Sequence, residues 1–90
     1  MSRELEIDFD RKPVIELQVS SMEAKWALSL RRGEEEMFLV KDRALAGRVT
    51  LPLADTIKWT GKEKVELRFY PGWSLGRAVE LDWIRLYYGR

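Results

Sequence analysis

Apolar and polar residues alternate with a period of two along most of the chain. The clearest runs cover residues 5–9, 15–19, 26–30, 49–53 and 65–69. Successive side chains of a β-strand point to opposite faces, so each run predicts a strand with one buried face and one wet face. Apolar spacings of three and four, which a helix would need, do not organise these runs. The alternation therefore favours an all-β fold.

Turn-forming residues separate the runs at intervals typical of a small sandwich. Gly33 lies where a hairpin between neighbouring strands should turn, and Gly61 precedes a predicted strand. Residues 71–76 contain one Pro and two Gly and read as a loop. About seven short strands in a chain of this length is sandwich spacing. We therefore predict one domain over residues 1–90, folded as an antiparallel β-sandwich.

Three segments depart from simple alternation. Residues 54–59 fit either a helical turn or a short irregular crossing. In the last strand, residues 77–88, the apolar residues before and after Asp82 fit opposite faces, and a β-bulge at Asp82 and Trp83 would bring them to the same face. The apolar residues that the bulge would bring to the core are Val79, Leu81, Ile84 and Leu86. Within residues 34–40, the inward-facing pair is either Met37 with Leu39 or Phe38 with Val40.

Composition argues against several classes of function. The chain has 16 Lys and Arg against 15 Asp and Glu, so it lacks the basic excess of most nucleic-acid binders. It contains no Cys and no His, which removes thiol nucleophiles, thiolate metal sites and the commonest general base. No apolar run approaches the roughly 20 residues that span a membrane. We expect no nucleic-acid partner and no membrane partner.

Catalysis is not expected either. Paired carboxylates can cleave a glycoside, and Glu16, Glu66 and Glu80 could share one face of the fold. However, a sandwich of this size rarely forms a deep site with distinct environments for two acids. The sequence also lacks a phosphate-binding glycine loop and any motif that carries chemistry.

Four segments of the chain follow one another in an order that is typical of one group of β-sandwiches. Residues 8–19 read as a strand, a proline and a second strand, and residues 25–30 supply the next strand. Residues 49–61 carry Thr, Leu, Trp and Gly at characteristic spacings, and residues 79–87 form a closing strand. Together they resemble the galactose-binding-like (discoidin-like) jelly rolls, which occur as carbohydrate-binding or accessory modules of bacterial polysaccharide-degrading enzymes.

The resemblance implies a jelly-roll sandwich with a non-catalytic role. Domains of that group usually begin with additional strands, so this chain would lack N-terminal strands. An uncovered sheet edge favours pairing with another chain, and homodimerisation or strand exchange is one expectation. Related jelly rolls often hold a structural calcium, but the aspartates here are scattered. We expect no metal and no cofactor, and Asp82 is the one position at which a calcium ligand would be sought.

Candidate ligand-binding residues form two groups. Sugar-binding modules stack pyranose rings on exposed aromatic faces, and Trp73 lies in the predicted loop at residues 71–76. The second group contains polar residues out of phase with the core, whose planar groups suit sugar hydroxyls and uronic-acid carboxylates. From this group we select Arg31, Glu66, Arg68 and Tyr70; it also contains Glu16, Gln18, Ser29 and Glu80. The alternatives are a loop anchor and an ordinary solvated face with cross-strand ion pairs.

The remaining large aromatic residues have structural interpretations. Trp26 is in phase with its apolar neighbours and should be buried, and Trp59 matches a core position of the resembled group. Trp83, beside the predicted bulge, is compatible with either face. Tyr87 and Tyr88 are adjacent, so they cannot both face inward.

These observations lead to one functional expectation and two alternatives. We expect a non-catalytic carbohydrate-binding or accessory module of a larger, extracellular polysaccharide-acting protein. Its partners would be a polysaccharide or oligosaccharide and neighbouring domains. One alternative is a structural or protein-interaction sandwich that packs against a neighbour or itself, marked by an apolar patch at Met22, Tyr87 and Tyr88. The other is a fragment with no function of its own.

Overall fold

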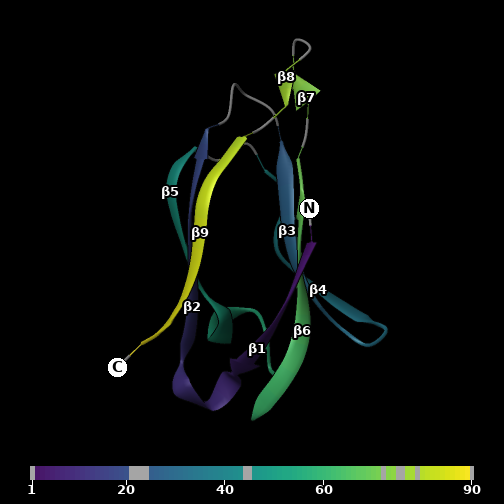
Figure 1. The fold of residues 1–90 in the computed structure, drawn as a ribbon, viewed down its shortest axis with the longest axis vertical. Coiled ribbons are helices and arrows are strands. Elements are labelled where there is room, and N and C mark those ends of the chain that lie inside the picture. Colours follow the sequence, from purple (N-terminus) through teal and green to yellow (C-terminus); the bar gives the residue numbers. More distant parts are fainter. Residues whose placement is uncertain are drawn as a thin grey trace.

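Two antiparallel β-sheets packed face to face form the body of the protein (Figure 1). This computed structural model describes residues 2–20, 25–43, 46–71, 73–74, 77–78 and 80–89, with side chains except at residue 42 and between residues 73 and 80. Sheet A has the strand order β1-β6-β3-β4, and sheet B has the order β5-β2-β9. The predicted all-β antiparallel sandwich is confirmed.

The strands follow the predicted runs closely. Sheet A consists of β1 (Ser2–Asp8), β6 (Lys62–Tyr70), β3 (Trp26–Arg32) and β4 (Glu35–Arg43). Sheet B consists of β5 (Gly47–Pro52), β2 (Pro13–Ser20) and β9 (Glu80–Tyr88). Two single-turn 3-10 helices, η1 (Phe9–Arg11) and η2 (Leu53–Asp55), lie at chain reversals.

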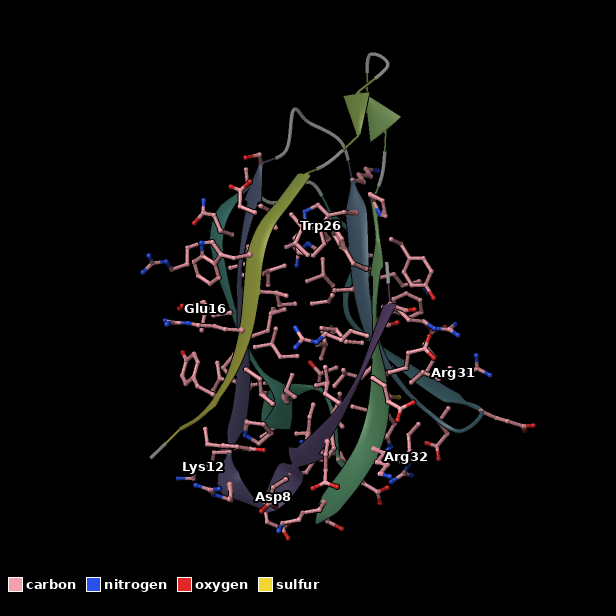
Figure 2. All side chains as sticks on the ribbon, in the orientation of Figure 1. Asp8, Lys12, Glu16, Trp26, Arg31 and Arg32 are labelled. Carbon is pink, nitrogen blue, oxygen red and sulfur yellow. The ribbon has the colours of Figure 1, made fainter. Side chains whose placement is uncertain are left out.

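The core is built from the inward-facing members of each alternating run. Trp26 is almost fully buried and packs edge-to-face on Phe69, with ring centres 5.5 Å apart. Figure 2 shows Trp26 lying between the two sheets. The other buried apolar residues include Ile7, Ile15, Leu17, Val19, Leu28, Leu30, Val40, Leu53, Ile57, Val65 and Leu67. Burial of these side chains supplies the main driving force for folding.

The predicted hairpin turn at Gly33 is confirmed. Arg32 pairs with Glu35 across β3 and β4, which leaves Gly33 and Glu34 as a two-residue loop. Gly33 has a φ of 59°, and Glu34 is not among the residues with positive φ. A positive φ at the first loop position alone defines a type II′ turn, which matches the twist of the flanking strands and favours glycine at that position.

The phase change of the last strand is a β-bulge, as predicted. The register of β2 against β9 shifts between Gln18 and Val19, whose partners are Trp83 and Leu81. Asp82 is therefore the extra residue. Leu81, Ile84 and Leu86 pack against the core as a result, whereas Val79 lies outside the described residues.

The prediction for β4 was wrong because this strand is also irregular. Met37 pairs with Leu30 and Val40 pairs with Leu28. Val40 is buried and both Met37 and Leu39 pack against the core, so neither predicted pair describes the strand alone. Phe38 lies opposite Ser29 on the outer face. The register shift between these pairs is a bulge that simple alternation does not show.

Two connecting segments contain short helical or strand elements. Residues 54–59 combine both predicted alternatives, because Ala54 and Asp55 belong to the helical turn η2 and the residues after it form an irregular crossing. Leu53 and Ile57 are buried. Residues 71–76, predicted as a loop, instead contain β7 (Trp73–Ser74), which pairs with β8 (Arg77–Ala78) in a separate small ladder. This ladder lies beyond one end of the sandwich in Figure 1.

The sandwich is open where the edge strands β1 and β9 approach each other. Two hollows of about 340 and 330 Å³ lie along this side, and Arg3, Leu67 and Ile84 line both. Among the described strands, β1 pairs only with β6 and β9 pairs only with β2. We call this side the β1–β9 seam. Among the described residues, no helix is long and apolar enough to cross a membrane.

Candidate functional site

The wider group of out-of-phase polar residues identified in the sequence does not form one face. Opposite residues in paired strands share a face of the sheet, and Ser29, Arg68 and Phe38 are linked in this way on the outside of sheet A. Glu16 and Gln18 belong to sheet B. In Figure 2, Glu16 and Arg31 lie on opposite sides of the molecule. The expectation that Glu16 and Glu66 could share a face was therefore wrong, because their strands belong to different sheets.

The outer face of sheet A, which we call the polar face, brings together four of the five predicted site residues. Arg31 pairs with Glu66 across β3 and β6, and Arg68 and Tyr70 follow along β6. On β3, β4 and β6 this face includes Ser29, Arg31, Glu36, Phe38, Glu66, Arg68 and Tyr70, and Ser2 and Glu4 of β1 lie opposite Arg68 and Glu66. Ser29 was expected to be wet, but it is completely buried beneath these larger neighbours.

The side chains of the polar face bind one another. Glu36 Oε2 accepts hydrogen bonds from Ser29 Oγ at 2.6 Å and from Tyr70 OH at 2.7 Å. Arg68 Nε donates to Glu66 Oε1 at 2.5 Å, and Arg31 Nε donates to the Gly33 carbonyl at 2.8 Å. The hydroxyls of Ser29 and Tyr70 and the Nε donors of Arg31 and Arg68 are therefore already engaged within the protein.

These contacts shift two protonation equilibria. The hydrogen bond from Ser29, and then that from Tyr70, lower the pKa of the Glu36 carboxyl from its ordinary value of 4.5. The hydrogen bond to Glu66 raises the pKa of the Arg68 guanidinium above its usual range. Both groups therefore stay charged at neutral pH, and the face is a set of paired charges.

Trp73 and Trp59, two tryptophans with predicted roles, lie in different parts of the fold. Trp73 lies on β7, and its side chain is outside the described part of the structure. Trp59 is half-buried against the core rather than within it. Its ring meets Phe9 edge-to-face at 5.6 Å and carries the Arg32 guanidinium 4.5 Å from its centre. Arg32 in turn pairs with Glu35 at 3.0 Å, so this cluster fastens the β3–β4 hairpin to the sandwich.

The outer face of sheet B has a different character. Its strand registers arrange nine residues in three rows across β9, β2 and β5. The rows are Trp83, Gln18 and Arg48; then Arg85, Glu16 and Thr50; then Tyr87, Val14 and Pro52. We call this surface the aromatic face.

Two large rings on this face are open to solvent. Trp83 and Tyr87 each have 38% of their surface exposed and occupy the same side of β9, four residues apart. Arg85 lies between them, with its guanidinium carbon 5.6 Å from the centre of the Trp83 ring and 5.4 Å from that of Tyr87. Tyr88 faces the other way and is half-buried, and its hydroxyl accepts a hydrogen bond from the Asp8 amide at 3.1 Å. The prediction that only one of these two tyrosines faces inward is confirmed.

A buried carboxylate holds this arrangement in place. Glu16 retains only 6% of its exposure, because it lies on the central strand β2 and its neighbours cover it. Its carboxylate is ion-paired to Arg85 Nη2 and accepts a hydrogen bond from Thr50 Oγ1 at 3.2 Å. Buried charges require such partners. Glu16 therefore fixes the guanidinium that separates the two exposed rings.

Sequence reasoning did not select the aromatic face, although one signal was available. Trp83, Arg85 and Tyr87 alternate with Ile84 and Leu86, which are apolar and fit the core. Once the bulge at Asp82 is accepted, this alternation places both rings and the arginine on the wet side.

The described residues form no metal site, and no known relative was found. Among the described residues, no three acidic, His or Cys side chains gather where they could hold a metal ion, and the Asp82 carboxylate accepts a hydrogen bond from Ser20 Oγ at 3.4 Å. A scan of protein-family models gave no match, and comparisons with curated proteins and with solved structures gave none either. The galactose-binding-like resemblance remains a prediction.

Proposed function

We propose that this domain binds carbohydrate without catalysis, through the aromatic face. The observation that carries the proposal is the pair of exposed rings, Trp83 and Tyr87, on one side of a single strand. Aromatic rings offer large, rigid apolar surfaces that suit the CH-rich faces of pyranose sugars. The same proposal makes the domain part of a larger, extracellular polysaccharide-acting protein, as the family resemblance implies.

The spacing of the rings favours a chain of sugars over a single sugar. Four residues along a strand separate the two backbone positions by about 13 Å, and the Arg85 guanidinium lies near both rings. A single pyranose cannot reach both rings, whereas an oligosaccharide lying along β9 can contact each with a different unit. Gln18 and Arg85 lie beside the rings and supply hydrogen-bond donors for hydroxyl groups.

The polar face supports binding less well, although it carries most of the predicted residues. Ser29, Tyr70 and Arg68 already donate to carboxylates of the protein itself. A sugar hydroxyl would have to displace these charge-assisted bonds, which are roughly twice as strong as neutral ones.

Two exposed tyrosines on opposite sheets allow a matched test. Tyr87 lies on the aromatic face with 38% exposure, and Tyr70 lies on the polar face with 41% exposure. We would measure retardation of the wild type, Tyr87→Ala, Trp83→Ala, Tyr70→Ala and Trp73→Ala in native gels that contain neutral or acidic polysaccharides. The proposal predicts retardation of the wild type that Tyr87→Ala and Trp83→Ala lose and Tyr70→Ala keeps.

Other patterns of retardation would contradict the proposed site. Loss in Tyr70→Ala alone would assign binding to the polar face, and loss in Trp73→Ala alone would assign it to the β7–β8 ladder. Absence of retardation by every polysaccharide would refute carbohydrate binding itself.

The β1–β9 seam favours a second candidate function, packing against a neighbouring domain or a second copy. The seam combines two unpaired strand edges with the half-buried apolar residues Leu5, Ile84 and Leu86. Sedimentation at increasing protein concentration tests self-association. A rise in mass that Leu86→Lys abolishes, with the β-sheet circular dichroism spectrum unchanged, supports this function; a constant monomer mass excludes the self-associating form. Met22, part of the patch expected from the sequence, lies outside the described residues.

A further inference from the structure

The exposed rings of the aromatic face lie among cations. The guanidinium carbons of Arg48 and Arg85 lie 5.9 and 5.6 Å from the centre of the Trp83 ring. These arginines come from the two outer strands of sheet B, β5 and β9, so they approach the ring from different directions. A sugar stacked on Trp83 would have both guanidinium groups within reach of its substituents.

The two arginines are not equally neutralised. Arg85 is ion-paired to the buried Glu16 carboxylate, which occupies only one of its five N–H donors. Arg48 has no carboxylate partner among the residues that the structure describes, and its neighbour across the strand pair is the neutral Gln18. The three rows of the aromatic face thus contain two cations and one anion, and the exposed Asp82 carboxylate lies at one end of the face, where Ser20 Oγ donates to it.

The Arg48 guanidinium, which lies beside Trp83 without a carboxylate partner among the described residues, distinguishes between classes of sugar. A neutral glycan lying on Trp83 offers hydroxyl oxygens to the arginines but no counter-charge, so it offsets only part of the cost of desolvating the guanidinium groups. A carboxylate on the sugar ring would instead form planar, charge-assisted hydrogen bonds with a guanidinium. We propose that the ligand of the aromatic face is a polysaccharide of uronic-acid units, with its carboxylates on Arg48 and Arg85. This inference rests on the proposed carbohydrate-binding function.

Stacking beside arginine is also the chemistry of single-stranded nucleic acid binding. That class depends on many phosphate contacts, and the chain carries a formal net charge of only +1. The aromatic face offers two arginines, Arg48 and Arg85, which is few for a continuous row of phosphates. We therefore favour a uronic-acid glycan.

Polygalacturonate and its fully methyl-esterified form provide the direct test, because they share one sugar backbone and differ in the charge of the carboxyl group. Gel retardation by each polymer would be measured for the wild type, Arg48→Gln and Arg31→Gln. The last variant is a matched control, because it makes the same change on the opposite sheet. Oligothymidylate serves as the nucleic-acid probe.

The proposal predicts retardation by polygalacturonate and little or none by the ester. Arg48→Gln should weaken binding about fivefold, the upper range for one partly exposed ion pair, while Arg31→Gln should leave it unchanged. Equal retardation by both polymers would overturn this inference but leave carbohydrate binding standing. Tighter binding of oligothymidylate than of polygalacturonate, or equal losses in both arginine variants, would also overturn it. If no glycan of the wider panel is bound, the proposed function fails first.

Discussion

The ion pair between Glu16 and Arg85 links the stability of sheet B to the geometry of the aromatic face, and its strength can be worked out from the structure. Hydrogen bonds to charged groups contribute about 1.5–3 kcal/mol when buried, whereas exposed ion pairs contribute about 0.2–1 kcal/mol. Glu16 is buried, but 61% of the Arg85 side chain is exposed. Solvent screening at Arg85 should therefore reduce the coupling energy to about 1 kcal/mol.

A double-mutant cycle with Glu16→Gln and Arg85→Gln measures this coupling energy. Both substitutions remove a charge and keep most of the side-chain volume. Arg85→Gln should destabilise more than Glu16→Gln, because it leaves a buried carboxylate with only Thr50 as a partner, whereas an unpaired Arg85 turns to water. Urea denaturation followed by circular dichroism gives the four free energies of unfolding, and about 1 kcal/mol corresponds to about 4–8 °C in melting temperature.

Two results would refute this reasoning. A coupling energy below about 0.3 kcal/mol lies within the additivity expected of independent sites, and would show that Glu16 does not hold Arg85. A larger loss from Glu16→Gln than from Arg85→Gln would show that burial of the carboxylate does not dominate the cost.

Two further predictions concern the core and the polar face. Trp26→Ala should lower the free energy of unfolding by about 3–5 kcal/mol, the range for buried aromatic residues, whereas Trp83→Ala should lower it by less than about 1 kcal/mol. Equal losses in urea denaturation would contradict the assignment of Trp26 to the core and Trp83 to the surface. The hydrogen bonds that lower the pKa of Glu36 should stabilise the fold above pH 4.5, and this stabilisation should be lost as the pH falls through the lowered pKa. Ser29→Ala and Glu36→Gln should therefore each make the free energy of unfolding less dependent on pH on the acid side. An unchanged acid dependence in both variants would show that Ser29 and Tyr70 do not hold the Glu36 carboxylate.

Strand positions were predictable because the alternation of apolar and polar residues is a local property. The runs containing Ile15, Leu28 and Val65 each gave a strand, and Gly33 marked its hairpin. The bulge at Asp82 was also visible, since the apolar phase changes on either side of it. The irregularity of β4 was not, because Met37, Phe38, Leu39 and Val40 are all apolar and carry no phase.

The assignment of strands to sheets was not predictable in the same way. The alternation predicts that Glu16 and Glu66 face away from the core, but it does not predict that their strands lie in different sheets. It also cannot show that Ser29 and Glu16 are covered by neighbours, because this depends on which strands are central. For the same reason, four of the predicted site residues lie on the polar face, where Arg68 binds Glu66 and Tyr70, and the exposed rings of β9 were not selected.

The most direct test of the central claim is a titration of the isotopically labelled protein with a short galacturonate oligosaccharide, followed by amide chemical shifts. The account predicts that the shifts that change belong to β9, β2 and β5, with the largest changes near Trp83, Arg85 and Arg48. It also predicts that the amides of β3 and β6 stay in place. Changes confined to β3 and β6 around Arg31 and Arg68, or no saturable change at any residue, would contradict it.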